Sequence, residues 1–435
     1  MSREQARDAA GVRPGVWSVA ALAVAALALV GRIHDAASLP PLQDFDGPGH
    51  ALNVVALHAG RLPEPTSWGG FHPPIYYALG ALVWEVLPPS VPVHVGLRWI
   101  SLAAGVGLAL WIWRSLRRRT DAADAALIAL LVFCTPVVVL ATSMLGNEAL
   151  CAFLVTGALA RTLEPPPAAG AVRHACVTGL WLAGALLTKA TALAAVGACA
   201  LGYAAWLVRR PRAAVAALAV VVALPLVAAA PHYARLLRAS GGGVLAVVSG
   251  GALSPLARAE MRAQLPGSRH LSDYLRLPPA SLLAPVYQAP GMLRSVPGLL
   301  YASTWADAHE QFLPASDPRV VAAEAGLALG GLLPTGLALA GLARVLRRPL
   351  AHRELLAPLA LAAGLLVALL RYTWVFPAYS AVKASYLLSA ALPAALCLSL
   401  GVGSVSGPRR AGLRGAFLAL ALACTLVTWR GWWAL

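Results

Sequence analysis

Long apolar runs alternate with short polar segments along nearly the whole chain of 435 residues. A helix needs roughly 20 mostly apolar residues to cross a bilayer, so this alternation predicts an all-α, polytopic integral membrane protein with about eleven transmembrane helices. The runs lie at 16–33, 94–113, 125–143, 149–160, 175–208 (a hairpin of two short helices), 213–230, 320–343, 355–370, 386–402 and 416–429.

Basic residues cluster between alternate runs, and this clustering predicts the orientation of the helices. Arginines follow the runs at 94–113, 320–343 and 386–402, and basic residues in short loops favour the cytoplasm. The polar segment 34–93 holds a single basic residue before Arg98 together with several acids, so we expect it outside. The apolar run at 73–87 is too short to cross. It is predicted to form a juxtamembrane or re-entrant helix on the outer side.

Composition agrees with a membrane protein. Only 12% of the residues are charged and 59% are hydrophobic, whereas a soluble domain carries about 25% charged residues. The net charge of +16 is explained by the cytoplasmic arginine clusters better than by nucleic-acid binding. The first run is followed by Arg32, His34 and Asp35 instead of a small-residue cleavage site, so we expect a retained helix. The six cysteines lie within apolar runs and show no metal-ligand spacing.

The alternation also predicts three regions. Residues 1–231 form a transmembrane module that includes the first external loop at 34–93. Residues 232–318 form a second, long external loop, and residues 319–435 form the C-terminal transmembrane helices.

Polar residues that are rare elsewhere in the chain gather on the predicted outer face. Carboxylates facing cations at the edge of a bilayer suit a reaction between a charged lipid headgroup and a polar acceptor. One acid would take the proton of the acceptor, and the cations would hold a phosphate and stabilise the charge that leaves with it. The candidates are Asp44, Asp46, His50, His72, Glu148, Lys189, Arg371 and Lys383.

Structural interpretations exist for the acids and the first histidine. Asp46 before Gly47-Pro48 also fits the N-cap of a short helix, and Asp44 also fits a solvated loop acid. Glu148 stands at a helix start, where an acid favours the helix dipole. His50 lies one turn from Asp46 and also fits a satisfied interfacial histidine.

The remaining candidates have simpler interpretations too. Lys189 could instead extend its side chain to the membrane–water interface without a catalytic part. His72 stands before two prolines, and this sequence could simply set the direction of the chain. Arg371 and Lys383 also fit interface anchors. A metal site is a further alternative, in which Asp46 and Glu148, with His50, bind a hard divalent cation such as Mg²⁺ or Mn²⁺.

Several of these residues stand in motifs that resemble one known family. An acid followed four positions on by His50, then Gly60-Arg61-Leu62-Pro63 and His72-Pro73-Pro74-Ile75-Tyr76-Tyr77, is similar to the first external loop of GT-C membrane glycosyltransferases. This family includes the protein O-mannosyltransferases and the lipid A aminoarabinose transferase. Asn147-Glu148 and the run from Gly184 to Thr188-Lys189 are similar to later family motifs. The resemblance covers residues 16–210, and Lys383-Ala384-Ser385-Tyr386-Leu387-Leu388 is similar to a weaker motif near the final helices.

The resemblance implies roles for these residues. Asp46 would be the base or metal-positioning acid and Glu148 the second acid. Lys189 and Lys383, beside Tyr386, would contact the lipid phosphate. Many relatives carry an Asp-Glu pair where this chain has Asp46-Gly47, which puts in doubt a mechanism that needs adjacent acids, although Asp44 could substitute.

The resulting hypothesis is an inverting glycosyltransferase at the outer face of the cytoplasmic membrane. By the resemblance, it would move a hexose or pentose from a polyprenyl-phosphate donor to a lipid, glycan or protein acceptor. A transporter or flippase of lipid-linked sugars is the alternative, but its ionisable groups would be expected near the bilayer midplane. A glycan ligase or polymerase that uses lipid-diphosphate donors would be expected to centre its chemistry on a large late loop.

Overall fold

The computed structural model describes residues 15–41, 46–65, 67, 69–164, 170–207, 211–240, 268–313 and 317–433. Every regular element in these ranges is helical, which confirms the predicted all-α class. The longer helices are α2 (Val16–Ser38), α3 (Gly47–His58), α4 (Ile75–Val86), α5 (Val93–Leu116), α6 (Ala122–Cys134), α7 (Pro136–Ser143), α8 (Glu148–Thr162), α9 (Ala171–Leu186), α10 (Leu193–Leu207), α11 (Pro211–Ser240), α15 (Val296–Trp305), α16 (Pro318–Gly330), α17 (Leu332–Arg347), α18 (Leu356–Val375), α19 (Ala391–Val402) and α20 (Pro408–Thr428). The short elements are η1 (Ala190–Ala192), η2 (Leu271–Tyr274), α14 (Ala280–Leu283), η3 (Pro349–Leu355), η4 (Tyr379–Ala381), η5 (Ala384–Ala390) and α21 (Arg430–Trp433).

Each of the eleven predicted transmembrane segments is largely helical, but the helices differ in length. Seven candidate spans among the described residues are long and apolar enough to cross a membrane, or eight if the bent pair α6 and α7 counts as one span. The helices α8, α9 and α10 are shorter. The chain is therefore a multi-pass membrane protein, and the number of eleven crossings stays a prediction.

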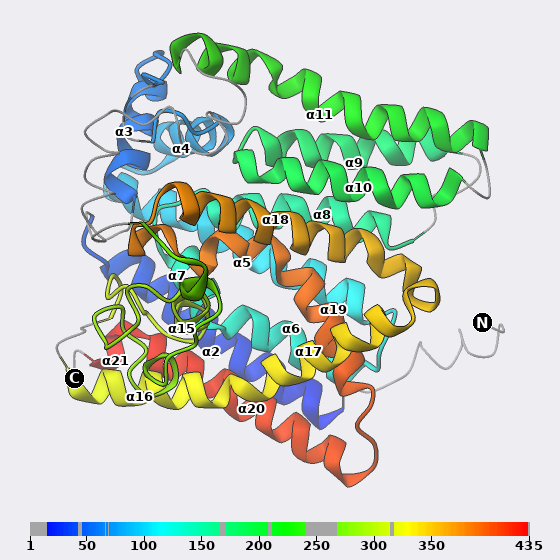
Figure 1. Cartoon of the computed structure of the whole chain (residues 1–435). Coiled ribbons are helices and arrows are strands. Elements are labelled where there is room, and N and C mark those ends of the chain that lie inside the picture. Colours follow the sequence, from blue (N-terminus) through cyan, green and yellow to red (C-terminus); the bar gives the residue numbers. More distant parts are fainter. Residues whose placement is uncertain are drawn as a thin grey trace.

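The long helices pack into one bundle, in which early and late parts of the sequence are neighbours. α2 packs against α6 and α20, α9 packs against α11, and α10 packs against α18. The predicted division at residues 231 and 318 stays a prediction. Most long helices run side to side in Figure 1, and the short helices α3, α4 and α15 gather toward one end.

Two helices continue beyond the apolar runs predicted for them. α2 continues to Ser38, past the predicted end of the first run at residue 33, and buries Arg32 and Asp35. The Arg32 guanidinium lies 3.7 Å from the centroid of the Phe133 ring, so the helix extends where its charges find partners. α11 continues past Pro231 to Ser240, because Tyr233 and Arg235 in this part of the helix donate hydrogen bonds to the carbonyls of Leu186 and Pro63.

Small residues and a proline shape the bundle. A Cβ atom at Gly341 or Gly401 would collide with backbone of the facing helix, so the contact between α17 and α19 requires glycine at both positions.

Pro136 follows the end of α6, and the chain bends by 59° between α6 and α7. A proline disfavours helical geometry in the residue before it. The bend directs α7 toward the segment Met144–Asn147, which leads into α8.

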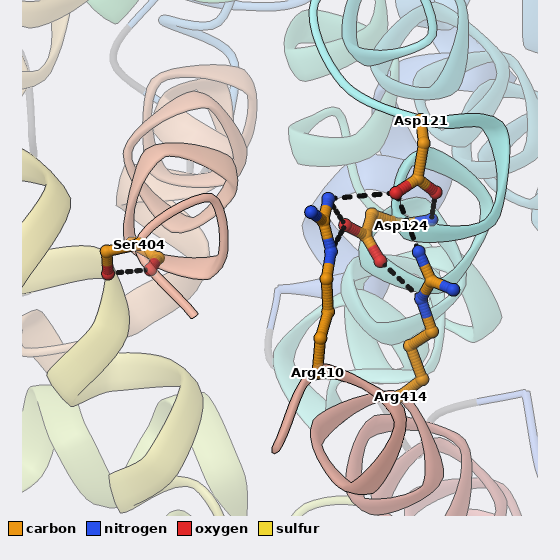
Figure 2. Close-up of polar contacts among 6 residues, drawn as sticks. Asp121, Asp124, Ser404, Arg410 and Arg414 are labelled. Carbon is orange, nitrogen blue, oxygen red and sulfur yellow. Dashed lines mark hydrogen bonds and ion pairs between the residues drawn. The ribbon is translucent and has the colours of Figure 1, made fainter. Parts of the chain in front are cut away.

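The two ends of the bundle have different chemistry. Trp17 at the start of α2 lies near Gly415 in α20, so the start of the first helix and the basic residues of α20 lie at the same end. Arg410 and Arg414 there bind Asp121 and Asp124 at the start of α6 (Figure 2). The helix α3, which Asp46 precedes, lies toward the opposite end with α4 and α15 (Figure 1).

Candidate active site

Asp46 stands at the entrance of α3, and its side chain contacts a lysine. It occupies the N-cap position, but its carboxylate accepts no capping hydrogen bond. The carboxylate oxygen instead lies 3.7 Å from the Lys383 ammonium. The lysine side chain is 8% exposed and the aspartate side chain is 29% exposed. The capping interpretation therefore does not explain the orientation of this carboxylate.

A buried arginine holds the two residues that follow α2. Arg98 in α5 is fully buried and donates hydrogen bonds to the carbonyls of Leu39 and Pro40, at 2.7 and 2.8 Å. These carbonyls follow the end of α2 and would otherwise lack helical partners. The contact anchors the beginning of the first external loop to the bundle.

Glu148 and Lys189 form a second, tighter ion pair. Glu148 is the first residue of α8, and Lys189 lies at the break between α9 and α10, where the sequence pattern predicted the tip of a hairpin. The Lys189 ammonium lies 2.5 Å from the carboxylate of Glu148. The side-chain amide of Asn147 donates to the Thr188 carbonyl at 3.1 Å, so the two turns are also joined by a neutral hydrogen bond.

An aromatic residue connects the two pairs. The Lys189 ammonium lies 4.9 Å from the centroid of the Tyr386 ring, and the Lys383 ammonium lies 5.9 Å from it. Both distances allow attraction between a cation and the face of a ring. Tyr386 belongs to η5, three residues after Lys383. The motif Lys383-Ala-Ser-Tyr386 therefore brings its lysine and its tyrosine to the same place.

Two candidate histidines of the first loop, the buried His50 and the half-buried His72, lie side by side. A ring nitrogen of His50 lies 2.8 Å from the Tyr77 hydroxyl, and the ring of His50 stacks on that of His72 with 5.5 Å between centroids. Burial lowers the pKa of both histidines. They are therefore neutral at pH 7 and act as hydrogen-bonding and packing groups.

These residues surround a pocket with about 590 Å³ of empty space, including the solvent at its mouth. Asp46, His50, Glu148 and Lys383 all line it, and α7 contributes apolar lining. Lys189 and Tyr386 are not among the lining residues. Lys189 contacts Glu148, and Tyr386 lies beside Lys383. Acidic and cationic side chains from three separate segments therefore converge on one cavity.

Two lining residues were not singled out from the sequence. Asp307 and His309 follow α15 and line the pocket. They lie in the predicted loop 232–318, which matched no familiar motif. The sequence signal was an acid and a histidine two residues apart in the largely apolar stretch around Trp305. Burial raises the pKa of Asp307 and lowers that of His309 to about 3, with a smaller lowering from the charge of Lys383.

Two candidates stand apart from this group. Asp44 lies outside the described residues. Arg371 is exposed on α18, although the next residue, Tyr372, packs against Tyr386 with ring centroids 5.9 Å apart. The candidates brought together are Asp46, His50, His72, Glu148, Lys189, Lys383 and Tyr386.

The donor set gives little support for a metal. No group of three or more His, Cys, Asp and Glu side chains that could hold an ion occurs in the described part of the chain. Asp46 and Glu148 each face a lysine ammonium instead. A divalent ion needs several oxygen ligands, so these residues alone do not form a site for Mg²⁺ or Mn²⁺.

Comparisons with known proteins identify the fold. No protein-family model and no curated protein sequence matches the chain significantly. The structure is similar to that of ArnT from Cupriavidus metallidurans bound to undecaprenyl phosphate, with a TM-score of 0.53, 16% sequence identity and coverage of 90% of this chain and 61% of that one. It is also similar to the Archaeoglobus fulgidus oligosaccharyltransferase in complex with Zn and sulfate, with a TM-score of 0.50, 15% identity and coverage of 93% and 52%.

The chain thus spans less than two thirds of the length of both similar proteins. At these identities the likeness concerns the fold. The chain has the helical membrane fold of the GT-C glycosyltransferases, as the sequence motifs predicted.

Proposed function

We propose that the chain is a glycosyltransferase that moves a sugar from a polyprenyl-phosphate donor to an acceptor, with inversion at the anomeric carbon. The reaction takes place at the outer face of the cytoplasmic membrane. The observation that carries this proposal is the pair of lysine–carboxylate contacts at one pocket, Asp46 with Lys383 and Glu148 with Lys189. The fold shared with ArnT, whose structure holds undecaprenyl phosphate, supports the choice of donor.

Asp46 and Lys383 suit the two halves of the reaction. Asp46 accepts the proton of the acceptor hydroxyl as the oxygen attacks the anomeric carbon. The bond between that carbon and the phosphate oxygen breaks, and the bonding electrons leave with the phosphate. Lys383 stabilises the charge that develops on the phosphate. The two charged atoms lie 3.7 Å apart, so their contact is an ion pair without a hydrogen bond.

The tighter pair has a supporting part. Lys189 neutralises Glu148, so a carboxylate can lie at the pocket without repelling the phosphate of the donor. Tyr386 lies beside both ammonium groups and fixes their separation. His50 and His72, which are neutral, shape the wall next to Asp46 and offer hydrogen bonds to sugar or acceptor. No step of this mechanism requires a metal ion.

The position of the ionisable groups favours the enzyme over the transporter. Transporters place such groups near the middle of the membrane. Here Asp46 precedes α3, Glu148 begins α8, and Lys189 lies at the break between α9 and α10. The groups therefore belong to the ends of the helices. The acceptor is a lipid, a glycan or a protein, and the sugar is a hexose or a pentose.

Sugar transfer in liposomes tests the proposal. The purified chain would be given undecaprenyl phosphate carrying a radiolabelled hexose or pentose, with a membrane and envelope extract as acceptor. Asp46→Asn removes the base and is expected to lower transfer by about 100-fold or more. Asp317→Asn is the matched control, because Asp317 caps α16 in an exposed pair with Arg319. Full activity of Asp46→Asn would remove this residue from the mechanism. Movement of the labelled lipid across the bilayer without transfer would favour the flippase.

A further inference from the structure

The turn after α15 contributes Asp307 to the lining of the pocket. Asp307 Oδ2 accepts hydrogen bonds from the backbone N–H groups of Phe312 and Leu313, at 2.5 and 2.9 Å. The backbone N–H of Asp307 donates to Glu324 in α16 at 2.6 Å. These three bonds fix the position of the side chain. The turn also includes Glu310 at a positive φ of 57°.

The second carboxylate oxygen of Asp307 has no such partner. The residue is 2% exposed, and its Oδ1 atom makes no hydrogen bond. Native structures satisfy nearly all buried polar atoms, and the exceptions call for an explanation. Asp307 lines the pocket that also holds Asp46 and Lys383. A ligand in this pocket can supply the missing donor.

The turn is coupled to the lysine of the active site. The backbone N–H of Ala384, next to Lys383, donates to Ser303 in α15 at 3.0 Å. Val382 on the other side of the lysine packs in one apolar cluster with Ala302 and Ala308. Asp307 and Lys383 are therefore held in one rigid unit. A group bound to the lysine lies at a set distance from the aspartate.

We propose that Asp307 is a specificity-determining residue that accepts a hydrogen bond from a hydroxyl of the donor sugar. This inference rests on the proposed function. The phosphate of the donor lies against Lys383, and the sugar attached to it extends through the pocket toward Asp307. The hydrogen bonds of this aspartate come from backbone N–H groups, and it makes no ion pair with a lysine or arginine among the described residues, so a neutral hydroxyl suits it.

The competing explanation is that Asp307 only stabilises the turn. Asp307→Asn separates the two, because the amide oxygen can still accept from Phe312 and Leu313. The amide NH₂ then replaces Oδ1, so an acceptor becomes a donor. A turn residue tolerates this exchange, whereas a sugar ligand loses its hydrogen bond. Asp317→Asn, in the exposed cap of α16, is the matched control for loss of a charge.

Binding to the detergent-solubilised full chain provides the test. The probes are undecaprenyl phosphate without sugar and the same lipid carrying glucose, galactose, mannose or arabinose, with affinity measured by ligand-induced thermal shift. The wild type is expected to bind at least one sugar-bearing lipid more tightly than the bare lipid. Asp307→Asn is expected to lose about tenfold in affinity for that lipid and none for the bare one, and Asp317→Asn is expected to match the wild type.

The outcomes distinguish the inference from the proposed function. Unchanged affinity of Asp307→Asn for the preferred sugar lipid would overturn the inference and leave the glycosyltransferase intact. Equal loss for bare and sugar-bearing lipids would assign Asp307 to the shape of the pocket, which also overturns it. A wild type that binds no polyprenyl phosphate, with or without sugar, would overturn the proposed function and the inference together.

Discussion

The two ends of the helix bundle hold similar charges in different arrangements. At the basic end, two arginines of α20 donate charge-assisted hydrogen bonds of 2.6 to 2.9 Å to Asp121 and Asp124 at the start of α6 (Figure 2). Asp124 in this network is 1% exposed. At the other end, Asp46 and Lys383 are 3.7 Å apart and line a pocket.

The difference separates a structural network from a reactive one. The planar guanidinium group of arginine can bind a carboxylate through two hydrogen bonds, and such pairs hold α20 and α6 in a fixed register. The Lys383 ammonium lies 3.7 Å from the Asp46 carboxylate, which is beyond hydrogen-bond distance, whereas the arginines of the basic end donate hydrogen bonds of 2.6 to 2.9 Å. The pocket, more than the presence of charges, thus distinguishes the end that we propose to be functional. Four variants can break or sharpen this contrast.

The largest effect on stability is expected from Asp124→Asn at the basic end. The substitution leaves two arginines with only Asp121 as a carboxylate partner. Removing one partner of a buried ion pair costs about 3 kcal/mol or more. Thermal unfolding of the detergent-solubilised protein measures the loss, and transfer per folded molecule should stay normal. Asp121→Asn is the control, since Asn keeps the helix cap. Equal stability of Asp124→Asn and wild type would show that the network does not hold the helices.

Lys383→Met tests the functional end and should affect affinity instead of stability. Loss of a hydrogen bond to a charged group costs about 1.5–3 kcal/mol, which corresponds to about 10- to 100-fold weaker binding of undecaprenyl phosphate. Lys383→Arg should restore part of the affinity, because the charge returns. Arg319→Gln, which breaks an exposed pair, serves as the control. Binding as tight as that of the wild type would place the phosphate elsewhere.

His309→Gln is expected to change the pH dependence of stability. Burial lowers the pKa of His309 to about 3 in the folded protein, while an unfolded histidine titrates near pH 6.5. The unfolded state binds the proton first, so stability is full above pH 6.5 and falls as the pH drops toward 3. The contribution at pH 5 is a loss of about 2 kcal/mol. The variant should therefore lose less stability than wild type between pH 7 and pH 5. Parallel pH curves for the two proteins would contradict this.

The smallest effect is expected from Arg118→Gln, also at the basic end. Arg118 pairs with Glu164, and the two side chains are 48% and 51% exposed. Exposed ion pairs contribute about 0–1 kcal/mol because water screens them. The free energy of unfolding should therefore change far less than in Asp124→Asn. A loss as large as that of Asp124→Asn would show that burial does not separate the two pairs.

Much of the fold could be predicted from the sequence. The period and length of the apolar runs predicted the helices, and the arginine clusters predicted which tips share one end. The Lys189 hairpin followed from basic residues on both sides of one long run. Boundaries were less predictable: Arg32 and Asp35 read as the end of a run, but side-chain partners from other helices allow α2 to continue to Ser38.

The site was predictable where a motif carried it. Asp46, Glu148, Lys189 and Lys383 were named from their positions at helix ends and from family-like motifs. Asp307 was not named as a candidate, because a single acid in a long loop belongs to no periodic pattern. Its importance depends on a turn, a buried oxygen without a partner and the neighbours that line the same pocket.

Sequence alone therefore determined the class of the protein and the order of its helices, and it predicted the end at which the candidate site lies. These properties follow from local hydrophobicity and charge, which each segment carries by itself. Tertiary structure decided which carboxylate faces which lysine, how loosely each pair is held and which loop closes the pocket. Such properties depend on distances between residues as far apart as Asp46 and Lys383, and only packing of the whole bundle sets those distances.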